Sequence, residues 1–305
     1  MQSNIAMENR AGIARITCGW KKSELSLEAV CRYWRDVHSP GISRRPGLWE
    51  YRHFQYAPVR ADLFASLLPE ISAEPPADEQ LMWQSDVRYL NDAELARFGS
   101  EPAPAVLKEL LGDIDLIVDK STTYKVLGTN AQTFCDSTGT LAPQGPVATP
   151  TYSVFFRQRG EQPAFFQLIE QIARRWAQTP GVLRVRMSLF EVPDMEAERK
   201  AGYPVKTHPL PMQYQALIDL SVASDAVASP LLEGFEPRLS ACVSAVHAYP
   251  VKVVYTSVCQ GRPTLVGLRG YPAYEAMTAL KADNQRDLGL LQWMYGPVVQ
   301  TGPVA

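Results

Sequence analysis

The feature that most constrains this chain is one order of expected elements that occurs twice. Between residues 12 and 119, β-branched and aromatic runs alternate with amphipathic runs in the order strand, helix, strand, strand, helix, strand. The same order returns between residues 152 and 258, without residue-level identity between the halves. This is the split β-α-β arrangement of a ferredoxin-like unit, and it predicts two such units in one chain.

The expected elements have ends marked by Gly, Pro and polar turn residues. In the first half we expect strands at 12–20, 48–56, 81–89 and 114–119, a helix at 27–38 with Ser26 as its N-cap, and interrupted helical segments at 92–111. In the second half we expect strands at 152–159, 182–192, 214–222 and 251–258, a helix that starts at Pro163, and a helix at 231–247. Beyond these, a strand at 264–268, a helix at 274–284 and an apolar tail at 288–295 are expected.

Residues 139–150 are rich in Gly and Pro and lack an apolar period, which is typical of a linker. We therefore expect a first ferredoxin-like unit over residues 1–145 and a second, degenerate unit over 146–262. Residues 263–305 would form a C-terminal extension packed on the barrel, and the sequence leaves open whether its tail is a lid or part of the core.

Each ferredoxin-like sheet carries helices on one face only, so its bare face needs a cover. Two units in one chain satisfy this requirement by packing sheet against sheet. The predicted fold is α+β, an intramolecular α/β barrel with a central cavity, in which residues 49–55 and 152–159 face the interior. Cavities between such layers are common binding sites for small molecules.

Composition excludes several classes of function. The 305 residues include 30 Lys and Arg against 32 Asp and Glu, so a polyanion-binding surface is not expected and neither is nucleic acid as a partner. No run of about 18 apolar residues is present, and residues 1–10 lack the apolar segment of a signal peptide. The 5 cysteines have no C-x-x-C spacing. We expect a cytoplasmic protein without a membrane partner or a metal site.

The run Tyr33-Trp34-Arg35-Asp36-Val37-His38-Ser39-Pro40, followed by Leu48-Trp49-Glu50-Tyr51, resembles the EthD-like group of dimeric α/β-barrel proteins. In that group a Y-W-x-x-x-H-x-P run closes the first helix and an aromatic-rich strand follows. The match covers about residues 12–56 and extends weakly to Asp119 through strand order. Members are commonly short and dimerise, so this chain resembles a fused dimer. The superfamily hosts isomerases, cyclases, monooxygenases and haem enzymes.

The resemblance to muconolactone methylisomerase-type members implies two catalytic residues. Those proteins use a histidine at the end of the first helix and a tyrosine on the next strand as proton-handling groups, and the matching positions are His38 and Tyr51. An imidazole exchanges protons near neutrality, and a phenol can stabilise an enolate. The alternatives are a histidine that binds the last carbonyls of its helix and a tyrosine that buries its ring. The second unit has no matching histidine, so one site is expected.

Further residues are expected to line the cavity through strand alternation. Trp49, Tyr51 and His53 share one face of their strand, and Asp86 and Arg88 form a polar stripe on the next. The predicted substrate-binding residues are Trp34, Trp49, His53, Trp83, Asp86 and Arg88. For His53 the favoured alternative is a histidine whose hydrogen bonds are satisfied within the sheet, and for Asp86 and Arg88 the alternative is an ion pair at a sheet surface. For Arg184 and Arg186 an outward-facing side of the strand is favoured over an anion-binding role, and His247 is expected to end a helix.

The resulting hypothesis is a cofactor-independent lyase or isomerase that uses His/Tyr acid–base chemistry on a small aromatic or lactone-like substrate in the barrel cavity. No cofactor is expected, although haem is not excluded. The alternatives are a cofactor-free or haem-dependent monooxygenase of the same fold, and a non-catalytic small-molecule-binding protein. A homo-oligomer is left open.

Overall fold

The computed structural model describes residues 2–191 and 206–296. Its first ferredoxin-like unit consists of four antiparallel strands in the spatial order β2-β3-β1-β4, with helices between β1 and β2 and between β3 and β4. The strands are β1 (Ile13–Lys21), β2 (Glu50–Tyr56), β3 (Trp83–Tyr89) and β4 (Val118–Leu127). The helices are α2 (Leu27–Tyr33), a π-helical turn η1 (Trp34–His38), α3 (Ser39–Ser43), α4 (Asp92–Ser100), α5 (Pro104–Leu111) and α6 (Ile114–Ile117).

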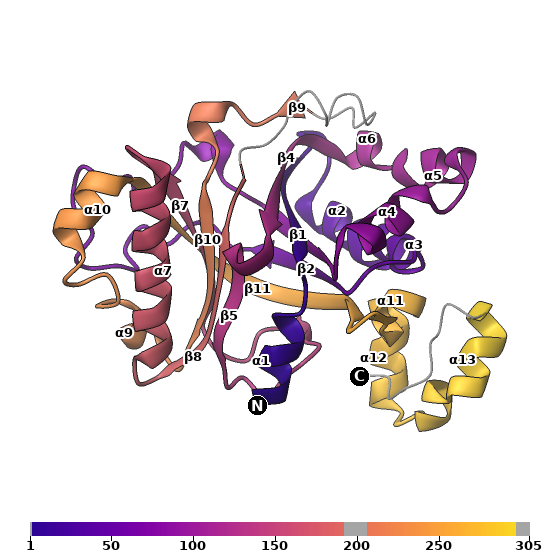
Figure 1. The fold of residues 1–305 in the computed structure, drawn as a ribbon. Helices are drawn as coiled ribbons and strands as arrows, with labels where there is room; N and C mark the ends of the chain where they lie inside the picture. The colour runs from indigo at the N-terminus through magenta and orange to yellow at the C-terminus, as the bar shows by residue number, and fades with distance from the viewer. Residues whose placement is uncertain (1, 192–205, 297–305) are drawn as a thin grey trace.

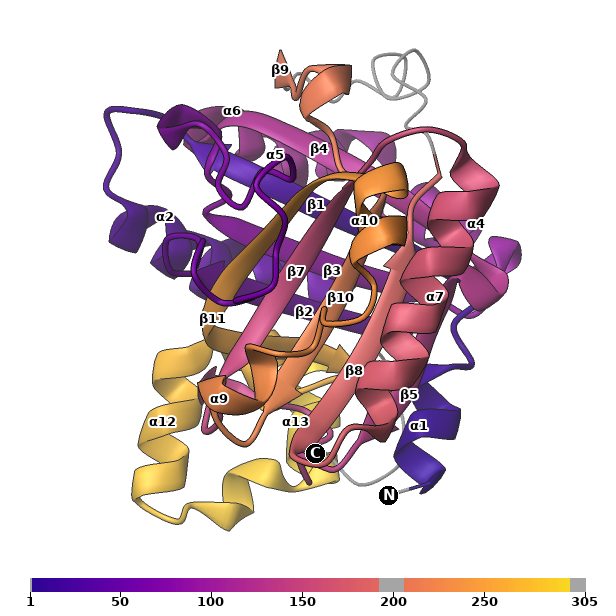
Figure 2. The same cartoon turned by 90° about the vertical axis from the view of Figure 1, so that its left-hand side faces the viewer.

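The second unit has the same topology, with strand order β8-β10-β7-β11. Its strands are β7 (Thr151–Gln158), β8 (Val182–Leu189), β10 (Ala216–Val222) and β11 (Val243–Cys259). Its helices are α7 (Gln162–Gln178), α9 (Asp225–Ala228) and α10 (Glu236–Cys242), and Figure 2 shows α7 and α10 lying over the strands. The structure thus confirms the α+β fold with two ferredoxin-like units.

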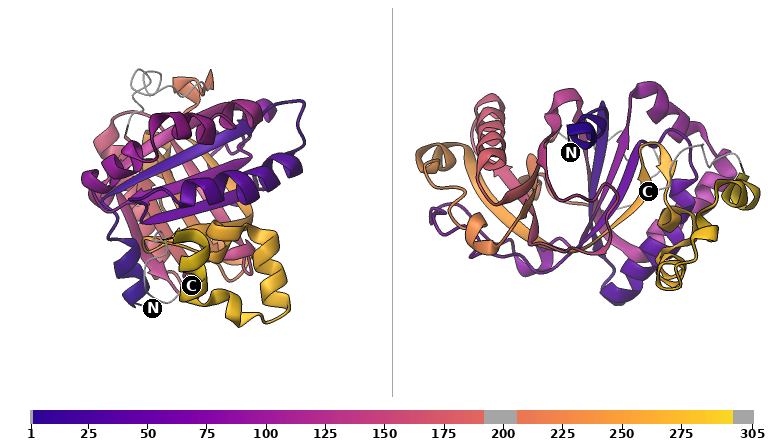
Figure 3. Two further views of the ribbon diagram at one scale, coloured as in Figure 1. Left: turned by 90° about the vertical axis from the view of Figure 1, so that its right-hand side faces the viewer. Right: turned by 90° about the horizontal axis from the view of Figure 1, so that it is seen from below.

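The last strand of each unit crosses to the other unit. The first part of β11 pairs with β7, and its second part pairs with β2, where Val254 lies opposite Phe54. In the same way β4 continues through η3 (Gly128–Asn130) into β5 (Ala131–Asp136), which pairs with β8. These crossings join all strands into one curled sheet, with one layer of helices on each outer side (Figure 1; Figure 3, right).

Helix α7 shows how the sequence builds the outer layers. Its apolar side chains recur at helical spacing, and the stripe that they form is fully buried against the second sheet: Phe165, Leu168, Ile169, Ile172, Ala173 and Trp176. The indole Nε1 of Trp176 donates a hydrogen bond to the Leu231 carbonyl at 2.7 Å. The predicted N-cap of α2 is confirmed, because Ser26 Oγ accepts a hydrogen bond from Ala29 N.

Three expected elements are wrong. Residues 114–117 form the short helix α6, and the strand begins only at Val118. The helix expected over 231–247 ends at Cys242, so that His247 lies within β11. Residues 265–269 form helix α11 in place of a strand. Short apolar runs are consistent with both the helical and the strand period. Pairing with a neighbouring strand, as β11 pairs with β7, decides which of the two elements forms.

The C-terminal extension forms a small helical layer below α3 (Figure 1). It contains α11 (Leu265–Arg269), α12 (Tyr271–Ala279), a 3-10 turn η5 (Asp283–Arg286) and α13 (Leu288–Tyr295). Leu291 of α13 is buried against Leu265, Leu268 and Met277. The described part of the tail therefore packs into a local core of its own.

Smaller elements complete the architecture. They are α1 (Gln2–Glu8), η2 (Ala77–Glu79), β6 (Gln144–Pro146), β9 (Lys206–Thr207), η4 (Leu210–Met212) and β12 (Arg262–Pro263). Strand β6 lies in the predicted linker and pairs with β11. Within the described residues, no helix has both the length and the apolar composition that a membrane span requires.

Candidate active site

Five of the predicted site residues meet in one place beneath the helices of the first unit. Trp34 lies at the centre of this group, which we call the aromatic–histidine cluster: Trp34, His38, Tyr51, His53 and Trp83. The Trp34 ring lies 4.3 Å from the His38 ring and 4.5 Å from the Trp83 ring, measured between centroids. All five side chains are buried. The cluster lies between η1 and the outer face of β2 and β3.

The π-helical turn η1 positions two members of the cluster. Such turns are rare and occur often at functional sites. Here the turn holds both Trp34 and His38 against the sheet. Its outer side is fixed by Asp36, whose carboxylate accepts hydrogen bonds from the Arg35 guanidinium and from Tyr271 N at the start of α12. The C-terminal extension therefore supports this turn.

A carboxylate orients the His38 imidazole. Nδ1 of His38 lies 3.0 Å from Asp113 Oδ2 and 3.1 Å from Oδ1, and the imidazole is 4% exposed. An Nδ1–H that donates to a carboxylate fixes the ring orientation and stabilises the imidazolium. This arrangement is typical of a histidine that exchanges protons through Nε2.

The Tyr51 hydroxyl is held by two donors. It accepts hydrogen bonds from Trp34 Nε1 and from Ser39 Oγ, each at 3.0 Å. Burial raises the pKa of Tyr51, so the phenol keeps its proton at neutral pH. A neutral phenol with two incoming donors is suited to hydrogen bonding with an anionic oxygen.

His53 is the unusual member of the cluster. It is 1% exposed, and neither ring nitrogen has a hydrogen-bond partner among the described residues. Burial, with smaller contributions from His38 and Arg35, lowers the pKa of His53 to about 3, so the imidazole is neutral. Trp83 Nε1 and Ser85 Oγ beside it are also buried without a partner in the described chain. Buried polar atoms almost always have partners, so these unpartnered atoms distinguish the cluster from ordinary apolar packing.

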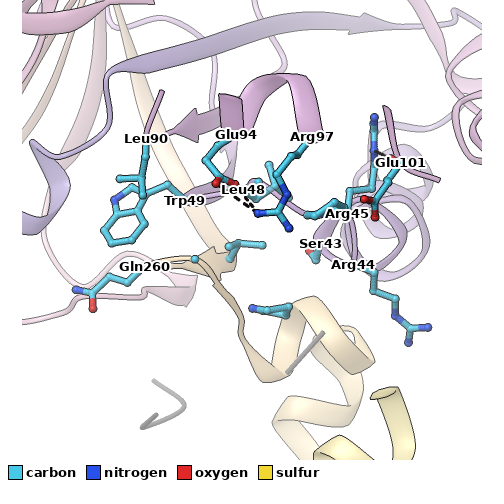
Figure 4. Close-up of a pocket in the computed structure, with 15 residues that line it drawn as sticks. Ser43, Arg44, Arg45, Leu48, Trp49, Leu90, Glu94, Arg97, Glu101 and Gln260 are labelled. Carbon is cyan, nitrogen blue, oxygen red and sulfur yellow. Dashed lines mark hydrogen bonds and ion pairs between the residues drawn. The ribbon is translucent and has the colours of Figure 1, made fainter. Parts of the chain in front are cut away.

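Trp49 does not join the cluster. It is buried at the wall of a separate cavity of about 480 Å³ between α4 and the β11–β12 turn, shown in Figure 4 with the Glu94–Arg97 pair. Its Nε1 donates to the Met7 carbonyl at 3.1 Å. The sequence placed Trp49 beside His53 because both lie on one strand face, but the strand β2 begins only at Glu50.

The interior-facing side of β2 is the opposite of the predicted one. Tyr51 and His53 face the helical layer, whereas Arg52 and Phe54 line a cavity of about 510 Å³ between the two sheets. Asp86 and Arg88 line the same cavity and so lie across the sheet from Tyr51. Residues 152–159 likewise turn Tyr152 and Val154 outward to α7. Alternation fixes which residues share a face, but not which face receives the helices.

The favoured outward placement of Arg184 and Arg186 is wrong. Both side chains line the cavity between the sheets, and Arg186 is 1% exposed. Sequence reasoning also missed Asp113, Ser39 and Ser85 in the aromatic–histidine cluster. Asp113 lies 75 residues from His38 in the chain, so no local spacing signals their contact.

Comparisons with known proteins find similar solved structures but no related sequence. No family model matches the sequence, and no curated protein matches it. A provisionally named monooxygenase from Fusobacterium nucleatum is 8% identical and aligns over 83% of this chain and 97% of its own, with a TM-score of 0.47. An anthrone oxidase-like protein is 9% identical over 82% and 94%, with a TM-score of 0.49. A dye-decolorizing peroxidase from Bacteroides thetaiotaomicron is 9% identical over 80% and 93%, with a TM-score of 0.40.

These structures resemble the chain in fold alone. They give no support to the EthD-like or muconolactone methylisomerase resemblance in particular. Their descriptions name provisional monooxygenases, chlorite dismutases and dye-decolorizing peroxidases, and the expected lyase or isomerase is not shown.

The expectation of no cofactor is contradicted, because the similar structures include proteins described as a chlorite dismutase and a dye-decolorizing peroxidase, which are haem-dependent enzymes. Haem iron takes His, Cys, Met or Tyr as axial ligands. None of these occurs among the described residues that line either cavity. In the described chain, no group of three or more His, Cys, Asp or Glu could hold a metal ion. These cavities therefore do not fit a haem.

Proposed function

We propose that the protein is an enzyme that transfers a proton to or from a small, flat organic molecule held in the aromatic–histidine cluster. The observation that carries this proposal is the concentration of unpartnered polar atoms on His53, Trp83 and Ser85 beside a carboxylate-oriented histidine. The resemblance of the Y-W-x-x-x-H-x-P run to the EthD-like group supports the same residues.

Each residue has a distinct role in this proposal. His38 removes a proton from carbon through Nε2, and Asp113 stabilises the imidazolium that forms. Tyr51 donates a hydrogen bond to the oxygen on which negative charge develops. His53 stays neutral and hydrogen-bonds a second polar atom of the substrate, while Trp34 and Trp83, which contact each other, provide an apolar wall beside it.

Two reactions share this first step. In a cofactor-free monooxygenase the deprotonated CH2 carbon reacts with O2, the added co-substrate and oxidant. One oxygen atom remains on that carbon as a carbonyl, and the other leaves as water with the two hydrogens of the CH2 group. In an isomerase or lyase the deprotonated substrate is instead reprotonated or loses a fragment. Oxygenation is the reaction that the descriptions of the similar structures name, and we propose it ahead of isomerisation.

The test is incubation of the protein with a panel of enolisable aromatic ketones and unsaturated lactones, followed by mass spectrometry and oxygen-electrode measurements. We expect a product in the wild type and a loss of turnover of about 10²–10⁴-fold in His38→Gln. A mass gain with oxygen uptake identifies the oxygenase, and an unchanged mass identifies the isomerase. The control is Arg174→Gln, an exposed substitution on α7.

The outcome that contradicts the proposal is full turnover in both His38→Gln and Tyr51→Phe. Binding of a panel compound without turnover would instead identify a non-catalytic binding protein.

A further inference from the structure

The cavity between the two sheets lies on the opposite side of β2 and β3 from the proposed active site. It measures about 510 Å³ and receives side chains from both ferredoxin-like units. Arg52 and Arg88 enter it from the first sheet, and Arg184 and Arg186 enter it from β8 of the second. Residues 137–149, which connect the units, supply another wall. The cavity exists only because the two units pack against each other.

The arginines of this cavity are held by carboxylates. Glu8, at the end of α1, accepts hydrogen bonds from Arg52 at 2.8 Å, from Arg184 at 2.8 Å and from Arg186 at 2.9 Å. Arg88 pairs with Asp86 on its own strand, and Arg184 also pairs with Asp136. These bonds fix the guanidinium groups in place without using all of their N–H donors.

Several of those donors remain without an acceptor. Arg186 Nε and Nη2, Arg88 Nη1 and Arg52 Nε are buried and have no hydrogen-bond partner within the described residues. Arg186 and Arg88 are 1% and 2% exposed. Each buried N–H of a charged group that lacks an acceptor costs free energy. The donors come from three arginines on two sheets, and the Glu50 carboxylate, which also lacks a hydrogen bond in the described part of the chain, lies 3.5 Å from Arg52 and 3.6 Å from Arg88. An oxygen-rich anion in the cavity would supply the acceptor that Nε and Nη2 of Arg186 lack within the described residues.

Carboxyl groups offset the charge of these arginines. Four guanidinium groups face three carboxylates that hydrogen-bond to them, namely Glu8, Asp86 and Asp136. Two more carboxyl groups lie in the same interior. Burial raises the pKa of Glu50, and burial together with the nearby Asp86 raises the pKa of Asp219 to about 6. Glu50 nevertheless lies 3.5 Å from Arg52 and 3.6 Å from Arg88, and Asp219 is ionised above about pH 6. An anion would therefore meet guanidinium donors in this cavity, and not a net positive charge.

The rest of the lining is apolar or carries hydroxyl groups. Phe54, Val254, Leu183, Pro146 and Val147 form the apolar part. We propose that this cavity is a second ligand site of the protein and binds a small organic carboxylate whose apolar body rests on these side chains. Guanidinium groups recognise carboxylates through paired hydrogen bonds, and the apolar lining separates such a ligand from a simple inorganic anion.

The experiment uses benzoate as the probe and the full-length protein, with affinity measured by calorimetry and the melting temperature as a second readout. We expect benzoate to bind with a dissociation constant on the order of 1 mM or tighter and to raise the melting temperature. Inorganic phosphate tests an anion without an apolar body, and benzamide tests the apolar body without a charge. Both are expected to bind at least about tenfold more weakly.

Two variants locate the site. Arg186→Gln removes the side chain with two unpartnered donors and should weaken benzoate binding by about tenfold or more. Because that change could unfold the protein, Ala148→Phe fills the cavity from an exposed loop position and should also abolish binding. The matched control is Arg174→Gln, which removes an arginine from the exposed face of α7 and should leave affinity unchanged.

The proposal is overturned if benzoate binds no more tightly than benzamide, or if Ala148→Phe binds benzoate as the wild type does. Tighter binding of phosphate than of benzoate would also overturn it, since the apolar lining would then have no part in recognition. These outcomes do not depend on His38 or Tyr51, so the proposal of this ligand site and the proposal of the active site are tested independently.

Discussion

The two faces of strand β2 serve two different sites. Tyr51 and His53 lie in the aromatic–histidine cluster, whereas Arg52 and Phe54 line the cavity between the sheets. The first site is built of rings and neutral hydrogen-bonding groups, mostly from residues close together in the chain. The second is built of ion pairs that join both units and α1. When both faces of a strand are covered, successive side chains of that strand can thus belong to two sites with different chemistry.

The largest expected effect is on the stability of the protein and concerns the cavity between the two sheets, which we call the arginine-lined cavity. Glu8→Gln removes the carboxylate that pairs with three arginines and leaves their charge uncompensated in the interior. We expect the free energy of unfolding to fall by about 3–5 kcal/mol, measured by urea denaturation. Glu170→Gln, which breaks an exposed pair with Arg174, should change it by about 0.5 kcal/mol or less. Equal effects of the two substitutions would show that Glu8 does not hold the cavity together.

The next effect concerns the aromatic–histidine cluster alone. Asp113→Asn keeps the shape of the His38 partner but removes its charge, so the imidazolium is no longer stabilised. We expect turnover of a panel substrate to fall by about 100-fold, with benzoate affinity unchanged. A parallel loss of benzoate binding would show that the two sites are coupled through the sheet, and unchanged turnover would remove Asp113 from the mechanism.

The pH dependence of benzoate binding separates the sites further. Asp219 lies opposite Arg186 and Ser153 across its strand and near Asp86, and burial raises its pKa to about 6. Below pH 6 Asp219 is neutral, and above it the added negative charge opposes an anionic ligand. Calorimetry should show the affinity for benzoate falling by up to about tenfold between pH 5 and pH 8. A fall of this size corresponds to an increase of about one unit in the pKa of Asp219 when benzoate binds. Asp219→Asn should abolish this dependence.

The smallest expected effect is on stability at His53. His53→Phe replaces two unpartnered ring nitrogens by carbon within a cage of tryptophan rings. We expect the free energy of unfolding to stay the same or to rise by up to about 1 kcal/mol in thermal denaturation, because no hydrogen bond is lost. Turnover should fall, because the phenyl ring of the variant cannot form the hydrogen bond that His53 makes to the substrate. A clear loss of stability would mean that His53 serves packing.

The sequence predicted the members of the aromatic–histidine cluster better than their surroundings. Trp34 and His38 share one helical turn, and Tyr51 and His53 alternate on one strand, so local periods bring each pair together. The carboxylate that orients His38 was out of reach, because Asp113 arrives from a distant loop through tertiary packing. A cavity between the sheets was predicted, with Asp86 and Arg88 in its lining, but Arg52, Arg184 and Arg186 were not predicted to line it. Their common partner Glu8 comes from α1, far away in the chain.

The sequence by itself determined the order of the elements in both units, the cap at Ser26 and the buried stripe of α7, because each follows from a period or a turn of a few residues. Tertiary structure alone decided which face of β2 meets the helices, where β11 crosses between the sheets and which charges share the interior. An alternating strand is equally consistent with either orientation. Only the layers that cover it make one face apolar and aromatic and leave the other to the arginines.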